Sequence, residues 1–424
     1  MGKALANLKN KDFLCLWLAQ VISQFGDRIN QMALIGLVAG RSPGSVLELA
    51  KILSFTIIPV FIVGPIAGVY VDRWDRRKTL FVCDFIRGLL VLSIPVVLLN
   101  QNSMIPIYGI VFLAFCLSRF YVPAKMSIIP DLVEKEDLLM ANSLVSTTGM
   151  IAFVFGCAFG GLLVEKIGVV GGFICDAVTF FISGILVFSI SGRLKLRLDR
   201  KELIDAGREM ITAIKKSVFE EIREGASYLL SHRDIRFIIS MLFILFAAAG
   251  AIYIVIIVFV QEVFQSTTKH LGFLAVFLGL GLFVGSLVYG RWGRRVSAFK
   301  AIFACLILGG IMMIVFASAM HQYPDLFLGS ALSFLLGLVV GPIVIAANTV
   351  IHEVASEKMR GKVFSFLEIV MHLGFLLAML ASSFLAEHIE KFWILMAVGG
   401  LFSFVGLGGL LTYKELRGGK GMAS

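Results

Sequence analysis

The chain has 424 residues, 58% of them hydrophobic, and a mean hydropathy of +0.94. Only 16% of the residues are charged, against about 25% in soluble domains, which excludes a soluble globular protein and indicates a chain solvated by lipid. The net charge of +10 would suit a nucleic-acid partner, but the basic residues are spread over one membrane face, and this distribution excludes nucleic acid.

A helix that crosses the hydrocarbon core of a bilayer needs about 20 mostly apolar residues. The sequence contains twelve such stretches, which predicts an all-α membrane protein with twelve transmembrane helices in two pseudo-symmetric six-helix halves. The expected domains are an N-terminal bundle (1–190), a cytoplasmic linker (191–235) and a C-terminal bundle (236–424). The expected spans are 12–40, 47–71, 79–99, 104–128, 138–164, 169–190, 236–260, 270–290, 299–319, 325–350, 361–386 and 392–412.

The basic residues fall almost entirely on one side of these spans when the N-terminus is placed in the cytoplasm. Short cytoplasmic loops are enriched in Lys and Arg, so this distribution predicts that both termini are cytoplasmic. The exceptions are five residues on the outer side, Arg41, Lys51, Lys166, Lys269 and Lys391, and three within spans, Arg28, Arg87 and Arg119.

The linker is the longest polar segment of the chain. Apolar residues recur in it at helical spacing, which predicts an amphipathic helix at the cytoplasmic surface, with a plain connecting segment as the alternative. These apolar residues are Ile211, Ile214, Val218, Ile222 and Leu229.

Span one is the most polar of the twelve. Its polar residues at helical spacing on one face are Gln20, Ser23, Gln24, Asp27 and Gln31. Asp27 lies roughly 22 Å into the helix at 1.5 Å per residue, and a charge at that depth is costly unless it is paired or hydrated. The face therefore predicts the lining of a central cavity, with a polar seam between helices as the alternative.

Other ionisable residues lie in later spans. Asp84 and Arg87 are three residues apart in span three and can pair in place; together with Asp176 in span six, they are expected to be structural. In span eleven, Glu368 and His372 share a helical face and can share a proton near neutral pH. We expect them to oppose Asp27 across the cavity, with a buried packing pair as the alternative.

A short basic turn recurs in the two halves. Residues 72–78 follow span two with the sequence Asp-Arg-Trp-Asp-Arg-Arg-Lys, and residues 291–295 follow span eight with Arg-Trp-Gly-Arg-Arg. Spans four and ten also match, since each carries a proline, Pro123 or Pro342, in its cytoplasmic half. A fixed internal period indicates duplication and predicts parallel repeats related by an axis along the membrane normal.

The turn after span two resembles the signature of the major facilitator superfamily. The pattern is Gly68-x-x-x-Asp72-Arg73-x-x-Arg76-Arg77. Asp75 departs from the usual glycine and resembles the macrolide-efflux-like and siderophore-exporter-like branch. The stretches 19–27, 123–125, 129–133 and 141–144 are also similar to that branch and, equally, to the lysophospholipid transporters.

The resemblance implies a gating role for these turns. Asp72 would accept hydrogen bonds at the start of helix eleven, near residues 360–362, and the neighbouring arginines would bind carboxylates or helix-terminal carbonyls. The alternative is a basic loop that only sets topology. The gating residues are Gly68, Asp72, Arg73, Arg76 and Arg77, and the second-half turn is Arg291, Arg294 and Arg295, with Gly290 at the position of the aspartate.

The resemblance also implies a coupling role for Arg119, because the family often carries an arginine in helix four that is linked to proton coupling. The Gln-Gly that usually follows is absent here. An ion pair of Arg119 with Asp84 or Asp27 is the alternative.

These features favour a secondary transporter of a bacterial-type inner membrane. We expect export of an amphipathic, drug-like or siderophore-like molecule in exchange for protons, with a lysolipid transporter as the alternative and a receptor, scaffold or enzyme on a transporter fold as a third hypothesis. The sequence holds no phosphate-binding loop, metal-ligand cluster or nucleophile elbow. We therefore expect no enzymatic activity and no cofactor, with the proton gradient as the energy source and a monomer in the bilayer. The expected substrate and coupling residues are Gln20, Gln24, Asp27, Gln31, Arg119, Glu368 and His372.

Overall fold

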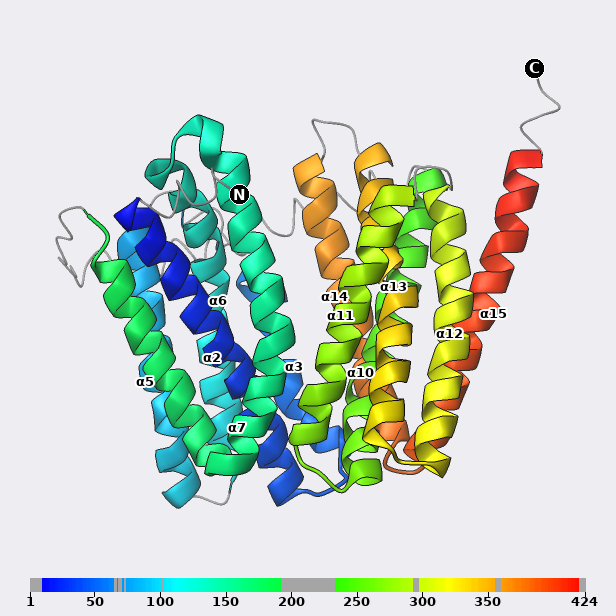
Figure 1. The fold of residues 1–424 in the computed structure, drawn as a ribbon, viewed down its shortest axis with the longest axis horizontal. Helices are drawn as coiled ribbons and strands as arrows, with labels where there is room; N and C mark the ends of the chain where they lie inside the picture. Colours follow the sequence, from blue (N-terminus) through cyan, green and yellow to red (C-terminus); the bar gives the residue numbers. More distant parts are fainter. Residues whose placement is uncertain are drawn as a thin grey trace. The chain divides into compact units, whose positions relative to one another are not determined.

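The structure is a computed structural model that describes residues 10–64, 67, 71, 74–100, 103–191, 233–292, 297–354 and 360–418. Every regular element in these residues is helical (Figure 1). Eight of the helices are long and apolar enough to cross a membrane. The elements are α2 (Lys11–Arg41), α3 (Val46–Ile62), α5 (Arg76–Asn100), α6 (Ile105–Leu132), the 3-10 turn η1 (Lys135–Asp137), α7 (Leu138–Phe188), α10 (Arg233–Phe264), α11 (Lys269–Trp292), α12 (Ala298–Gln322), α13 (Leu326–Val354), α14 (Arg360–Leu385) and α15 (Lys391–Gly418).

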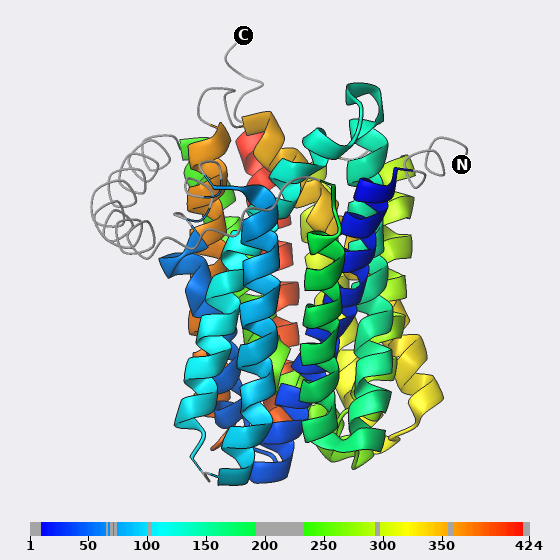
Figure 2. The ribbon, with the colours of Figure 1, turned by 90° about the vertical axis from the view of Figure 1, so that its left-hand side faces the viewer.

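Helix α7 is two helices joined by a tight turn. Its 51 residues would span roughly 76 Å as one straight helix, more than twice the thickness of a hydrocarbon core. Gly168, with φ 78° and ψ 170°, breaks it, because glycine adopts positive φ without steric cost. The chain reverses direction there (Figure 2). With α7 divided in this way, the described residues contain one helix for each of the twelve expected spans, and the predicted all-α membrane fold is confirmed.

The chain divides into two compact units. Unit 1 comprises Met1–Leu37 and Lys51–Ala226, and unit 2 comprises Val38–Ala50 and Ser227–Ser424. In unit 1, α5 packs against α6 and α7, and in unit 2 the corresponding α12 packs against α13 and α15. This repeated pairing is what a duplicated six-helix bundle should show. The expected amphipathic helix of the linker lies outside the described residues.

Close helix packing in unit 2 depends on two matching glycine pairs. Gly281 and Gly285 on α11 face Gly337 and Gly341 on α13, and a Cβ on any of the four would overlap backbone atoms of the opposite helix. Ser286 also donates a hydrogen bond to the Gly341 carbonyl at 3.2 Å. Small residues spaced four apart allow this approach in membranes, where packing rather than water exclusion drives helix association.

One carboxylate caps a helix from far along the chain. Glu387, just after α14, accepts hydrogen bonds from the Ser45 hydroxyl at 2.9 Å and from the Leu47 amide at 3.1 Å, at the start of α3. Nearby, Lys391 pairs with Glu262 at 2.8 Å. The Glu387 oxygen thus satisfies an orphan N–H of α3 and favours its positive dipole end. This contact joins the segment Val38–Ala50 to the rest of unit 2, residues Ser227–Ser424.

We expect the Glu387→Ala substitution to loosen that segment. Loss of a helix cap costs about 1 kcal/mol, which corresponds to about a fivefold change in an opening equilibrium. Hydrogen exchange of the amides in residues 42–50 should therefore become about fivefold faster. Glu390→Ala removes a neighbouring acidic side chain and should leave this exchange unchanged. Equal exchange in the Glu387→Ala variant and the wild type would show that the cap does not hold the segment.

Candidate functional site

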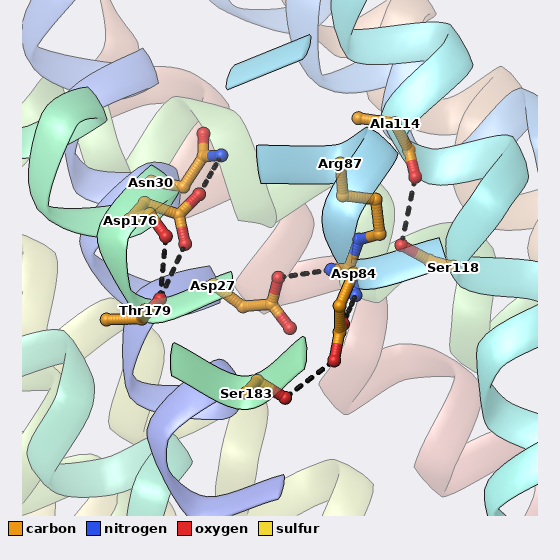
Figure 3. A network of polar contacts seen from close by, with 9 residues as sticks. All are labelled: Asp27, Asn30, Asp84, Arg87, Ala114, Ser118, Asp176, Thr179 and Ser183. Carbon is orange, nitrogen blue, oxygen red and sulfur yellow. Dashed lines mark hydrogen bonds and ion pairs between the residues drawn. The ribbon is translucent and has the colours of Figure 1, made fainter. Parts of the chain in front are cut away.

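A network of charged and polar side chains lies inside unit 1, with Arg87 at its centre (Figure 3). Arg87 on α5 donates from Nη2 to Oδ1 of Asp27 on α2 at 2.6 Å. Its Nη1 lies 3.7 Å from Oδ1 of Asp84, one turn earlier on α5. The i, i+3 spacing places Asp84 and Arg87 on one helical face, and the packing of α2 brings Asp27 to the same cation.

The three members of this ion-pair network differ in exposure. The Asp84 side chain is 0% exposed, that of Arg87 is 6% exposed and that of Asp27 is 29% exposed. The Arg87 guanidinium also lies over the Phe180 ring, 4.0 Å from its centroid, which adds a cation–π contribution. Asp27 is therefore the carboxylate of the network that a proton or a ligand reaches first.

A second branch of the network leads from α2 to the second helix of α7. Asn30 donates from Nδ2 to Oδ2 of Asp176 at 2.5 Å, and Asp176 is 0% exposed. Gly26 permits this contact, since a Cβ there would overlap the Thr179 hydroxyl and the Asp176 carboxylate. The small residue before Asp27 thus lets α2 and α7 approach closely enough to bury a carboxylate between them.

The third branch approaches the end of unit 1 that carries Arg76 and Arg77. Ser183 on α7 donates to Oδ2 of Asp84 at 2.6 Å. Lys125 on α6, 8% exposed, interacts electrostatically with Asp27 and Asp84. At 1.5 Å per residue, Ser183 lies roughly 8 Å and Asp176 roughly 18 Å from the end of α7. The network therefore extends over about 10 Å along α7, which is about a third of a hydrocarbon core 30 Å thick.

Two arginines at the start of α5 bind the ends of other helices within unit 1. Arg76 pairs with Asp131 near the end of α6 at 2.5 Å, and Arg77 donates to the Ile190 carbonyl beyond the end of α7 at 2.8 Å. These are a carboxylate and a helix-terminal carbonyl, the kinds of partner expected for these arginines. Asp75 accepts from the amides of Arg77 and Lys78, each at 3.0 Å. It therefore caps α5, which gives a physical role to an aspartate at a position that is usually glycine.

A model of the transmembrane secretion effector family matches residues 2–354 of the chain. The chain belongs to this family of major facilitator transporters. It is 27% identical over 361 residues to the uncharacterised MFS-type transporter YkuC of Bacillus subtilis, a match that covers 84% of this chain and 81% of YkuC. It is 22% identical over 394 residues to macrolide efflux protein A of Streptococcus pyogenes, covering 91% and 92% of the two chains. The crystal structure of a bacterial homologue of the iron transporter ferroportin has the same fold, with a TM-score of 0.69 at 14% identity over 94% and 98% of the chains.

The family membership confirms the resemblance that was expected from the turn after span two. This transmembrane secretion effector is a multi-pass membrane transporter and not an enzyme, and relatives such as macrolide efflux protein A are efflux proteins.

In this transporter the polar side chains of span one contact two different neighbouring helices, α7 and α5. Gln20 is 1% exposed and donates to the Val145 carbonyl on α7 at 2.9 Å. Gln24 lies against Gly149 on α7, where an added Cβ would be 3.3 Å from the Gln24 Oε1. These two side chains thus lie in a helix seam, as in the alternative to a cavity lining. Asp27 alone turns toward Arg87.

Arg28 lies in the same seam, further along α2. Its guanidinium donates to Gln31 at 2.7 Å and stacks over the Phe153 ring, 5.0 Å from the centroid. Gly156 leaves room for the Arg28 stem, since a Cβ there would lie 2.8 Å from it. Gln31 therefore contacts a neighbouring arginine on its own helix.

Arg119 lies half-buried on α6, but the ion pairs of Asp27 and Asp84 are with Arg87. Sequence reasoning treated Asp84, Arg87 and Asp176 as structural and overlooked Asn30. The available signal was a concentration of charge, because the first six spans hold three deep aspartates together with Arg28, Arg87, Arg119 and Lys125. Charged residues are costly in lipid unless they pair with one another.

The structure describes only some of the remaining expected site residues. His372 is half-buried on α14 in unit 2, and Arg291 lies at the end of α11. The backbone of Glu368 belongs to α14, but its side chain lies outside the described part of the chain. The gating residues Gly68, Asp72 and Arg73 and the second-half residues Arg294 and Arg295 also lie outside it.

Proposed function

We propose that this transporter is a secondary active exporter that moves an amphipathic small molecule out of a bacterial cell by alternating access, in exchange for protons. It acts as a monomer in the inner membrane with both termini in the cytoplasm. The basic residues support this orientation, because Arg76, Arg77 and Lys78 lie at one end of unit 1, as short cytoplasmic loops require.

One observation carries the proposal: a buried arginine stands between two carboxylates of which one is accessible. Arg87 binds Asp27 at 2.6 Å and lies 3.7 Å from Asp84. A cationic ligand on Asp27 weakens the shorter pair and frees Arg87 for its other neighbours. Charges at this depth are rare in membrane proteins unless they line a pathway or a proton relay.

This arrangement couples two ligands through one cation. A ligand shifts a conformational equilibrium only by its different affinities for the two states. Here a cationic substrate competes with Arg87 for Asp27 and adds a positive charge to the network, so its binding disfavours a proton bound to the same network. Such mutual exclusion of the two ligands is the requirement for exchange of substrate against protons.

The efflux direction and the amphipathic substrate are supported by the similarity to macrolide efflux protein A over 91% of the chain. The chain itself contributes 37 Phe and 16 Met residues. Aromatic and thioether side chains adapt to varied apolar shapes, which suits a drug-like molecule with an apolar body more than a sugar.

Transport by the purified protein in lipid vesicles tests the proposal. The probes are a macrolide, a fluorescent lipophilic cation and a fluorescent lysolipid, each with and without an imposed pH gradient. We expect the drug-like probes to accumulate only with the gradient and to leak back when a protonophore is added. Gradient-independent movement of the lysolipid, with no movement of the drugs, would instead identify a lipid transporter.

A further inference from the structure

Asp176 differs from the other two carboxylates of the network because its hydrogen-bond partners are all neutral. Its Oδ2 receives Asn30 Nδ2, and its Oδ1 lies 3.4 Å from the Thr179 hydroxyl. That hydroxyl carries one proton and lies closer to the Asp176 main-chain carbonyl, at 2.7 Å. Among the described residues, no Lys or Arg lies within 4.0 Å of the Asp176 carboxylate.

The nearby cations are committed to other carboxylates. Both terminal nitrogens of Arg87 face Asp27 and Asp84. Lys125 interacts electrostatically with the same two carboxylates. The charges that act on Asp176 from the helices around it are therefore Asp27 on α2 and Arg87 on α5, with Asn30 and Thr179 as neutral hydrogen-bond partners.

The charges of the network do not balance if every group is ionised. Three carboxylates, Asp27, Asp84 and Asp176, then stand against two cations, Arg87 and Lys125. An excess charge in the interior of a bundle is expensive to desolvate. A single bound proton makes the network neutral.

The Asn30 side chain beside Asp176 can accept a hydrogen bond from a protonated carboxyl group. Asn30 is 9% exposed, and its Oδ1 is buried without a hydrogen-bond partner. The two ends of an amide are assigned from its contacts, so a turned Asn30 presents Oδ1 to Asp176. A protonated Asp176 then donates to that oxygen.

We propose that Asp176 holds the proton that is exchanged for substrate, and this inference rests on the proposed antiport. Asp176 is a neutral acid while Arg87 is paired with Asp27 and Asp84. When a cationic group of the substrate takes Asp27, Arg87 is freed next to Phe180, one helical turn from Asp176. The positive charge then favours ionised Asp176, whose O–H bond breaks and whose proton passes to water. One cation enters the network and one proton leaves it.

Infrared spectroscopy of the purified protein tests the protonation directly. At neutral pH, the wild type should show the carbonyl stretch of a protonated carboxyl group buried from deuterium exchange. Asp176→Asn, which has nearly the shape of the neutral acid, should lose this band. Asp12→Asn, a carboxylate on α2 outside the network, should keep it. Asn30→Ala should shift the band in frequency, because the acid loses its acceptor.

Proton release tests the exchange itself. Addition of tetraphenylphosphonium to the wild type should release about one proton per bound cation into a weakly buffered solution with a pH dye. Asp176→Asn should bind the cation and release none. In vesicles, this variant should retain downhill flux and lose accumulation driven by a pH gradient.

Each result separates this inference from the proposed function. Persistence of the carboxyl band in Asp176→Asn overturns the assignment of the proton, whether or not the protein transports. Loss of the band without proton release by the wild type makes Asp176 a permanently neutral structural acid and overturns its role in exchange. Absence of gradient-driven transport by the wild type, with the band assigned to Asp176, refutes the antiport alone.

Discussion

Replacing Arg87 by Met should destabilise unit 1 more than any other single substitution in the network. The change removes the cation from two carboxylates at once, Asp27 and Asp84, and Asp84 is 0% exposed. Removing one partner of a buried ion pair costs about 3–5 kcal/mol, because the remaining charge has lost its counterion in a medium of low dielectric constant. We expect a clear drop in the thermal unfolding temperature of the detergent-solubilised protein.

Arg28→Met is the matched control for this substitution. Arg28 is also an arginine within a span, but its partners are Gln31 and the Phe153 ring. Its loss leaves no carboxylate without a counterion, so a smaller destabilisation is expected. Asp84→Asn in the Arg87→Met background should recover part of the lost stability, since an amide needs no counterion. Equal effects of the two arginine substitutions would show that Arg87 is not the stabilising centre of the network.

Asp27→Asn should abolish gradient-driven transport and leave the protein folded. The neutral amide does not hold Arg87 or a cationic substrate as a carboxylate does. Arg87 keeps Asp84 within 3.7 Å, so the bundle retains an ion pair. We expect accumulation of a drug-like cation in vesicles to fall to the level of protein-free vesicles, while the elution profile and unfolding temperature stay near those of the wild type.

The same change of charge elsewhere on α2 provides the control. Asp12, at the start of α2, accepts a hydrogen bond from the Ser191 amide at 2.8 Å. Asp12→Asn should therefore transport at nearly the wild-type rate. Undiminished uphill transport by Asp27→Asn would remove Asp27 from the mechanism and leave its ion pair with Arg87 as a structural contact.

Much of the fold follows from the sequence, because a bilayer imposes simple length and polarity limits. Backbone groups in lipid must be satisfied within a helix, so an apolar stretch of sufficient length has few alternatives to spanning. Gly168 shows the same constraint, since 51 helical residues must reverse to remain in the membrane. Arg76 and Arg77 bind a carboxylate and a helix-terminal carbonyl, as arginines commonly do, while the gating role of the turn stays a prediction.

The candidate site was harder to predict from the sequence, because helical periodicity describes one helix at a time. Gln20, Gln24 and Asp27 share a sector of α2, but the seam with α7 takes Gln20 and Gln24, whereas Asp27 turns to Arg87. Spacing alone could pair Arg87 with Asp84. It could not show that Asp27 meets the same cation.

The sequence by itself determined that this protein is an all-α, multi-pass membrane protein, since hydropathy acts on each segment separately. Only the tertiary structure decided which of its intramembrane charges meet. Ion pairing depends on distances between atoms of different helices, and those distances are set by packing, such as the contact of Gly26 with Thr179 that brings α2 against α7. Three aspartates were visible in the sequence from the start, but that one of them, Asp176, has no cation of its own among the described residues became evident only once the helices were packed.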